Sequence, residues 1–309
     1  MKINAIAPWF GGKRTLASRI VEALGPHSAY WEPFCGSMAV LMAKPPCRSE
    51  TVNDLHGDLI NLARVVRDRH YGPKLYRMLR RTLIHEGLFS EAESEIHGNT
   101  IEVGEADDAR QDLDRAYMFF LSIWLGRNGL AGTTDGNCGR SFCVRYTANG
   151  GSSSTRFNSA VSSVPAWRKR LRNVTIIRRD AFAILERIDD TESTAIYCDP
   201  PYIEKTCEYI YDFASADHQR LATALARFRH ARARPLGLDA EDSILEPVPI
   251  GIVDQRNLAL RIVDKLVVVV PCGHPEDGVR RVACQPLVPL PVVKQPSLPV
   301  EERDDMVIG

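Results

Sequence analysis

The sequence predicts an α/β protein with a doubly wound, Rossmann-like sheet and an inserted, partly helical region. Residues 29–43 and 51–66 each place a short apolar run before polar residues, a turn and a helical pattern. This strand–helix alternation is typical of a parallel sheet. A third apolar run, Ala195-Ile196-Tyr197, is stopped by two prolines, which cannot donate to a sheet ladder. The charged stretch 70–121 has a helical pattern and supplies the insertion.

Polar residues follow the first two predicted strands. Glu32 ends the first strand, and Gly36 lets the backbone approach a ligand closely. The G-x-G-x-x-G pattern is absent because Met38 stands where a second glycine would help, so a small uncharged or cationic cofactor is favoured over a pyrophosphate. Asn53-Asp54 follow the second strand, where a carboxylate binds ribose hydroxyls in nucleoside sites. Either acidic residue alone could instead cap a helix.

Residues 8–14 form an aromatic and glycine-rich loop before a helix predicted from Thr15 to Leu24. A nucleotide P-loop is excluded, because Arg14 follows Lys13 where Ser or Thr is required and Ala7 replaces the first glycine. We expect Trp9 or Phe10 to pack on a flat ring of a cofactor. The alternative is a turn with a core tryptophan.

The stretch Asp199-Pro-Pro-Tyr202 follows the third predicted strand. A carboxylate and a fixed carbonyl, from Asp199 and Pro200, can accept hydrogen bonds from an exocyclic amino group such as that of adenine and draw electron density towards its nitrogen. Pro200 and Pro201 stiffen the turn, and Tyr202 offers a face on which a base can stack. The alternative is an ordinary turn after a strand.

Composition limits the classes of function. The 309 residues carry no formal net charge, so DNA binding would need a local basic face. The eight cysteines form no Cys-x-x-Cys pair, and Cys138 and Cys143 have no nearby paired histidine, so no metal site is expected. Without a visible secretory signal or a long apolar run, the default expectation is a reduced, cytoplasmic, soluble protein.

Four motifs, taken together, resemble the DNA adenine methylase family. They are Phe10-Gly-Gly-Lys13, Glu32-Pro-Phe-Cys-Gly36, Asn53-Asp54 with Asp58-Leu-Ile-Asn61, and Asp199-Pro-Pro-Tyr202, over about residues 5–228. The resemblance implies S-adenosylmethionine as cofactor and N6 of adenine in double-stranded DNA as acceptor. It also implies that the base is flipped into the pocket.

The resemblance assigns site residues as well. Asp199, Pro200, Pro201 and Tyr202 are the catalytic set. The cofactor-binding set is Trp9, Phe10, Lys13, Glu32, Phe34, Gly36, Asp54, Asp180 and Asp199. Within it, Asp54 holds the ribose, and Asp180, after a strand predicted over 174–177, lies beside the cofactor's adenine or caps a helix.

Other acceptors stay open as alternatives. Cytosine N4 chemistry usually carries Ser in place of Asp199, and a protein-glutamine acceptor usually carries Asn there. A further alternative is a catalytically impaired DNA-binding remnant. The resemblance also admits a cognate restriction endonuclease as a partner.

Target recognition is predicted for residues 67–166. Within it, 122–158 is rich in Gly, Ser, Thr, Asn and Arg, which is typical of loops that contact a polar partner. The predicted DNA-binding residues are Arg127, Asn128, Arg140, Arg145 and Arg156. The alternative is a disordered surface loop. The basic segment 167–172 is expected to form a solvated helix face or to contact phosphates.

The C-terminal stretch differs from the rest. All 23 aromatic residues lie in 1–228, whereas ten of the 19 prolines follow residue 230. We divide the chain into a cofactor-binding part (1–66), the recognition region (67–166), a catalytic part (167–230) and an atypical tail (231–309). One strand is predicted within the tail, over 263–270. We hypothesise that the tail is a replaced or frame-shifted segment, which the other reading frames of the coding DNA would test.

Overall fold

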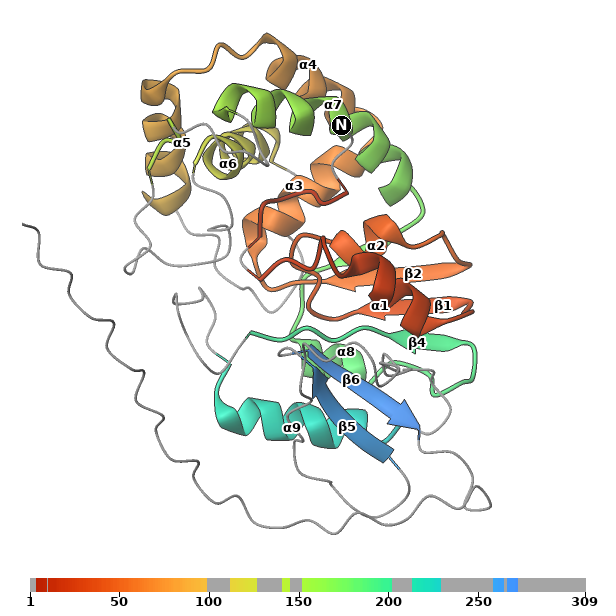
Figure 1. Cartoon of the computed structure of the whole chain (residues 1–309). Helices are drawn as coiled ribbons and strands as arrows, with labels where there is room; N and C mark the ends of the chain where they lie inside the picture. The colour runs from red at the N-terminus through yellow and green to blue at the C-terminus, as the bar shows by residue number, and fades with distance from the viewer. Residues whose placement is uncertain are drawn as a thin grey trace, which may run out of the picture. The chain divides into compact units, whose positions relative to one another are not determined.

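The protein is described from a computed structural model (Figure 1). The description covers residues 4–9, 11–98, 112–126, 141–144, 152–201, 213–228, 258–263 and 266–271. The chain divides into units 1–274 and 275–309, and the second lies wholly outside these ranges.

Four short strands of the described chain form a parallel sheet: β1 (Ala29–Glu32), β2 (Ser49–Asn53), β3 (Thr175–Ile177) and β4 (Thr194–Ile196). Their order is β3-β2-β1-β4. In register, Trp31 of β1 pairs with Thr51 of β2 on one side and with Ile196 of β4 on the other. The strand order therefore reverses beside β1, and such a switch point opens a crevice at the carboxyl ends of the strands. The predicted α/β class is confirmed.

Short helices precede the first strand and follow β1, β3 and β4. Helices α1 (Ala17–Leu24) and α2 (Ala39–Ala43) pack on each other, and α8 (Ala181–Leu185) packs against α9 (Ser215–Leu225). Helix α1 buries Ala17, Ile20 and Leu24, and it begins two residues later than the helix predicted from Thr15 to Leu24. Strand β4 is buried at all three positions, because helices cover a parallel sheet on both faces.

The insertion forms a group of helices (Figure 1). It contains α4 (Tyr71–Arg81), α5 (Glu86–Gly98), α6 (Leu113–Leu125) and α7 (Ser153–Leu171), which pack together with α3 (Gly57–Arg67). Their core is aromatic: Trp124 and Trp167 stack, and Phe120 contacts both rings. Both edges of the stretch 122–158 are helical rather than loop, since residues 122–125 end α6 and residues 153–158 begin α7.

The atypical tail contains an antiparallel pair, β5 (Leu258–Val263) and β6 (Leu266–Pro271). The sequence predicts one strand over 263–270, and the structure has two, because the apolar run on each side of residues 264–265 can pair with the other. No helix within the described ranges is both long and apolar enough to span a bilayer.

Candidate active site

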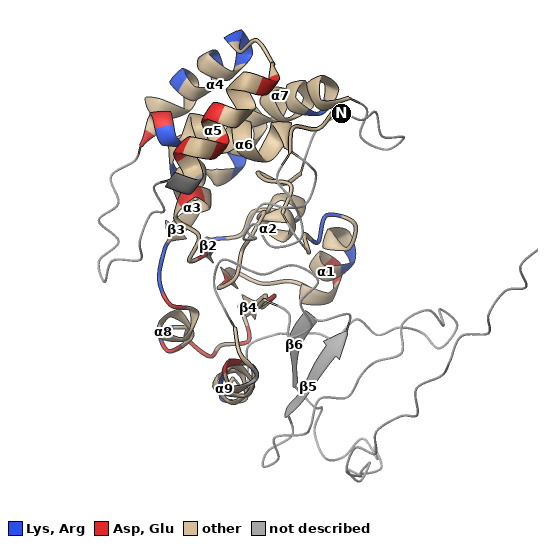
Figure 2. Cartoon of the chain, turned by 90° about the vertical axis from the view of Figure 1, so that its left-hand side faces the viewer, with Lys and Arg blue, Asp and Glu red and all other residues tan. Residues whose placement is uncertain are grey.

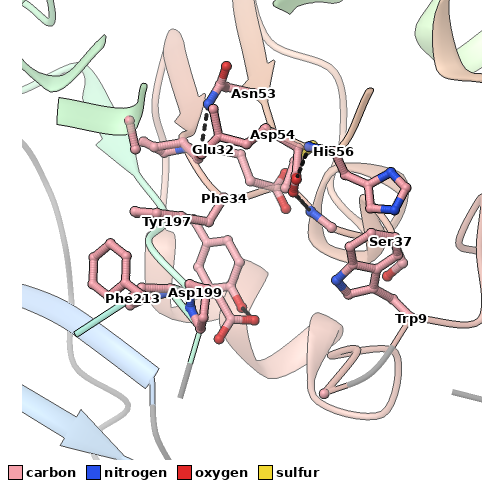
Figure 3. Close-up of a pocket in the computed structure, with 18 of the residues that line it drawn as sticks. Trp9, Glu32, Phe34, Ser37, Asn53, Asp54, His56, Tyr197, Asp199 and Phe213 are labelled. Atoms are coloured by element: carbon pink, nitrogen blue, oxygen red, sulfur yellow. Dashed lines mark hydrogen bonds between the residues drawn. The ribbon is translucent and has the colours of Figure 1, made fainter. Parts of the chain in front are cut away.

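A pocket opens at the carboxyl ends of the strands, beside the switch point between β1 and β4 (Figure 3). Its wall comes from the loop before α1, the β1–α2 turn, the β2–α3 turn, the start of α8, the end of β4 and the start of α9. The structure brings ten of the predicted site residues to this pocket: Trp9, Lys13, Glu32, Phe34, Gly36, Asp54, Asp180, Asp199, Pro200 and Pro201. Phe10 and Tyr202 lie outside the described residues.

Asp199 stands just beyond β4, which Tyr197 extends by donating its backbone N–H to Trp31 O. Lys13 Nζ lies 2.9 Å from Asp199 Oδ1 and 2.8 Å from Oδ2, and it also donates to Gly11 O. The hydroxyl of Tyr197 donates to Asp199 Oδ2 at 3.3 Å. Burial raises the pKa of Asp199 above its usual value, whereas Lys13 acts to lower it. The ion pair with Lys13 therefore favours the ionised form of Asp199, whereas burial in the pocket favours the protonated form.

Glu32, at the end of β1, is a second buried carboxyl group in the pocket, only 2% exposed. Tyr30 Oη donates to Glu32 Oε2 at 2.9 Å. Burial raises the pKa of Glu32 to about 8, and the nearby negative charge of Asp199 adds to this effect. A carboxyl group with this pKa is poised to ionise when a cation enters the pocket.

The turn after β1 brings the backbone close to Trp9. Gly36 has φ +41°, and a Cβ atom there would lie 2.8 Å from Trp9 Cδ1. Met38, two residues later, has φ 58°, and its side chain is completely buried. A non-glycine residue in the left-handed region has a strained backbone. The burial of the Met38 side chain offsets the free-energy cost of this strain. Glycine at position 36 is thus required for two reasons, its backbone angle and the adjacent indole.

Asn53 and Asp54 tie three turns together. Asp54 accepts from the backbone N–H groups of Gly36 at 2.8 Å and His56 at 3.0 Å. Asn53 donates to Pro33 O and Arg179 O. Burial raises the pKa of Asp54, although hydrogen bonds from the backbone of His56, Gly36 and Leu55 oppose this. Each carboxylate oxygen of Asp54 can accept more than one hydrogen bond, so these contacts leave capacity for a ligand hydroxyl.

The far wall of the pocket is aromatic. Phe213 stacks on Phe182 with ring centroids 6.1 Å apart and meets Phe34 edge-on at 5.6 Å. The guanidinium of Arg220 lies 3.8 Å from the centroid of Phe182. Asp180 caps α8, because its Oδ1 accepts from Phe182 N and Ala183 N. Asp180 is thus a helix cap that also lines the pocket, and its place beside a cofactor's adenine stays a prediction.

Some pocket residues are not singled out by the sequence. Tyr197, His56 and Arg220 line the pocket, but no motif distinguishes them from ordinary strand or helix residues. Phe213 lies in the aromatic stretch 209–213, and that cluster before a helix is the available signal. Burial also raises the pKa of the Cys35 and Cys198 thiols, so neither is prepared as a thiolate nucleophile.

The predicted DNA-binding residues divide into two groups. Arg127, Asn128, Arg140 and Arg145 lie outside the described residues. Arg156 lies in α7 and is only 8% exposed. Its guanidinium donates to Trp124 O at 3.2 Å and Gly126 O at 2.6 Å, at the carboxyl end of α6. Arg156 is therefore a buried structural contact between α6 and α7, contrary to the prediction that it faces DNA.

The fold is thus a doubly wound α/β sheet with a pocket at the carboxyl ends of its strands, and the Asp199-Pro-Pro turn lies at the edge of that pocket. Residues 9–245 match the D12 class N6 adenine-specific DNA methyltransferase family, and the chain belongs to that family. Methylation of adenine N6 in DNA is accordingly its activity. A curated relative is the "Retron Ec67 DNA adenine methylase" of Escherichia coli, 25% identical over 249 residues that cover 79% of each chain.

Proposed function

We propose that this adenine methyltransferase takes its methyl group from S-adenosylmethionine and acts on an adenine turned out of duplex DNA. The observation that carries the proposal is the Asp199-Pro-Pro turn at the end of β4, beside a pocket that also holds Glu32 and Asp54. The family supports a methyl donor, and the chemistry of the lining supports this one.

The lining fits the parts of S-adenosylmethionine. The molecule is a nucleoside with a sulfonium and an ammonium group, and when bound it supplies an electrophilic methyl group. Asp54 would hold ribose hydroxyls, Asp180 and Phe182 would border the adenine, and the Gly36 turn would admit the methionine part. The buried carboxyl of Glu32 would offset the positive charge.

The chain's own groups prepare the acceptor. The lone pair of an adenine amino group is delocalised into the ring, so the nitrogen is a weak nucleophile. Asp199 and the Pro200 carbonyl accept its two N–H donors and hold the nitrogen in one orientation. The stiff Pro200-Pro201 turn keeps both acceptors in place, and positioning of this kind is worth several kcal/mol, about 7–11 in favourable cases. Tyr202 is proposed as the stacking partner of the base.

Contacts to DNA are proposed for Arg127, Asn128, Arg140 and Arg145, which follow α6 in the sequence. Two described helices of the insertion differ in surface charge (Figure 2). Helix α4 is basic, with exposed Lys74, Arg77, Arg80 and Arg81. Helix α5 is acidic, with exposed Glu86, Glu91 and Glu95. Arg156 is proposed to stabilise the end of α6 instead. A cytoplasmic location and a restriction endonuclease partner stay predictions from the sequence.

The experiment is transfer of labelled methyl from S-adenosylmethionine to unmethylated duplex DNA, followed by analysis of the nucleosides. We expect label in N6-methyladenine, and a decrease of about 10²–10³-fold in kcat for Asp199→Ala and for the isosteric Asp199→Asn, the scale for loss of one preorganised hydrogen-bonding group. Thermal unfolding shows that each variant is folded, and calorimetry with S-adenosylhomocysteine shows whether each variant still binds the cofactor.

Three results would contradict parts of this proposal. Label in N4-methylcytosine would change the acceptor, and undiminished transfer by Asp199→Asn would remove Asp199 from catalysis. A folded wild-type protein that binds the cofactor but transfers no label would favour the DNA-binding remnant and implicate the atypical tail.

A further inference from the structure

His56 lines the pocket and contacts Phe119 of α6, and it is only 7% exposed. It is the N-cap of α3, where its Nδ1 accepts from Leu59 N at 3.2 Å. Its backbone N–H donates to Asp54 Oδ1 at 3.0 Å. Main chain and ring are therefore both held, so the imidazole has one defined position.

The imidazole has an aromatic neighbour on each of two elements. Trp9 meets it at a centroid distance of 5.2 Å and an interplanar angle of 75°, an edge-to-face contact that the close-up shows (Figure 3). Phe119 of α6 lies at 5.4 Å and 38°. His56 thus links the loop before α1 to the helix that leads into the predicted DNA-binding segment.

Trp9 is confined between His56 and the β1–α2 turn. A Cβ atom at Gly36 would lie within 2.9 Å of two indole atoms, so the turn leaves the indole no space on that side. On the side of the β2–α3 turn, the indole packs against His56. Within the described residues, this is the only aromatic contact of Trp9. Trp9 lines the pocket, so its position forms part of the shape of that wall.

We propose that His56 is a positioning residue that fixes Trp9 for cofactor binding and joins that wall to α6. The inference rests on the proposed use of S-adenosylmethionine in this pocket. A cap alone does not require a ring, because Asn, Asp and Ser accept the same N–H bond with a small side chain. The ring of His56 supplies a second interaction, which those residues lack.

Two variants separate the cap from the ring. His56→Asn keeps an N-cap acceptor and removes the ring, whereas His56→Phe keeps a ring and removes the acceptor. The dissociation constant for S-adenosylhomocysteine is measured by calorimetry, Tm by thermal unfolding, and kcat and KM by methyl transfer at saturating DNA.

For His56→Asn we expect the dissociation constant and the KM for the cofactor to rise about threefold to tenfold, the scale of a single aromatic pair. Its kcat at saturating cofactor should stay within about twofold of wild type, because the acceptor groups at Asp199 are untouched. His56→Phe should restore cofactor affinity to near the wild-type value while Tm falls by about 2–4 °C because the cap is removed.

If His56→Asn binds S-adenosylhomocysteine as tightly as the wild type, the inference is overturned. It is also overturned if both variants bind more weakly in proportion to their loss of Tm, because the effect is then one of stability. A wild-type protein that binds no S-adenosylhomocysteine would instead refute the proposed cofactor. The two failures are therefore distinguishable in the same titrations.

Discussion

Lys13 and Asp199 are 186 residues apart in the chain, yet Lys13 Nζ contacts both carboxylate oxygens of Asp199 at 2.9 and 2.8 Å. Both side chains are largely shielded, with 8% and 17% of their surfaces exposed. In the proposed mechanism an adenine amino group donates to one Asp199 oxygen, and the ammonium contacts both of them. Lys13 therefore favours the ionised form of Asp199, and in the proposed mechanism it shares or releases one oxygen when the base binds.

The first prediction concerns this ion pair. Lys13 lowers the pKa of Asp199 against the upward effect of burial, so Lys13→Met should let that pKa rise further. In the proposed mechanism activity needs the ionised carboxylate, so it is lost as pH falls through the pKa of Asp199. The acidic limb of the pH–rate profile should thus move to higher pH in Lys13→Met and stay near its wild-type position in Lys13→Arg. Rate profiles of kcat for the three proteins check this, and identical acidic limbs would contradict it.

The second prediction concerns Glu32 and the stability of the cofactor-free protein. Its pKa is about 8 when folded against 4.5 for an unperturbed Glu, so between these values the folded state holds a proton that the unfolded state has lost. The free energy of unfolding should therefore fall as pH rises from about 4.5 to 8, by at most about 1.4 kcal/mol per pH unit. Urea unfolding of wild type and Glu32→Gln measures this. Equal slopes for both proteins would show that Glu32 is not the responsible group.

The third prediction uses two glycines with positive φ. Gly36→Ala and Gly25→Ala should both lose stability, by about 1–3 kcal/mol, because each places a side chain at an unfavourable backbone angle. Only Gly36→Ala meets Trp9, whereas a Cβ at Gly25 has nothing within 4 Å. Cofactor affinity should thus fall in Gly36→Ala alone. Calorimetric titration of both variants tests this, and a matching decrease in Gly25→Ala would point to a general effect of instability.

The fourth prediction distinguishes burial from DNA contact at Arg156. Arg156→Met should cost about 1.5–3 kcal/mol of stability, since two carbonyls at the end of α6 lose a charged donor. The slope of log binding constant for DNA against log salt should not change. Arg140→Met, at a predicted phosphate or base contact, should reduce that slope by about 0.9 for each phosphate that the arginine neutralises. A reduced slope in Arg156→Met would return Arg156 to the DNA-contacting group.

Much of the site is predictable because polar residues mark the ends of buried strands. Glu32, Asp54 and Asp199 each follow an apolar run, and parallel strands bring their carboxyl ends to one edge of a sheet. The pairing of Lys13 with Asp199 is not predictable, since nothing local to either residue refers to the other. Gly-rich composition predicts loops over 122–158, yet the edges of that stretch are helical because aromatic packing between α6 and α7 overrides local preference.

Taken by itself, the sequence determined the α/β class, the Asp199-Pro-Pro turn and the family resemblance, because these depend on local periodicity, on proline and on short motifs. The tertiary structure decided which residues share the pocket and what state they are in. Burial raises the pKa of Glu32, Arg156 is withdrawn from solvent, and His56 lies between Trp9 and Phe119. Each of these outcomes depends on groups distant in the chain, whose approach only packing can set.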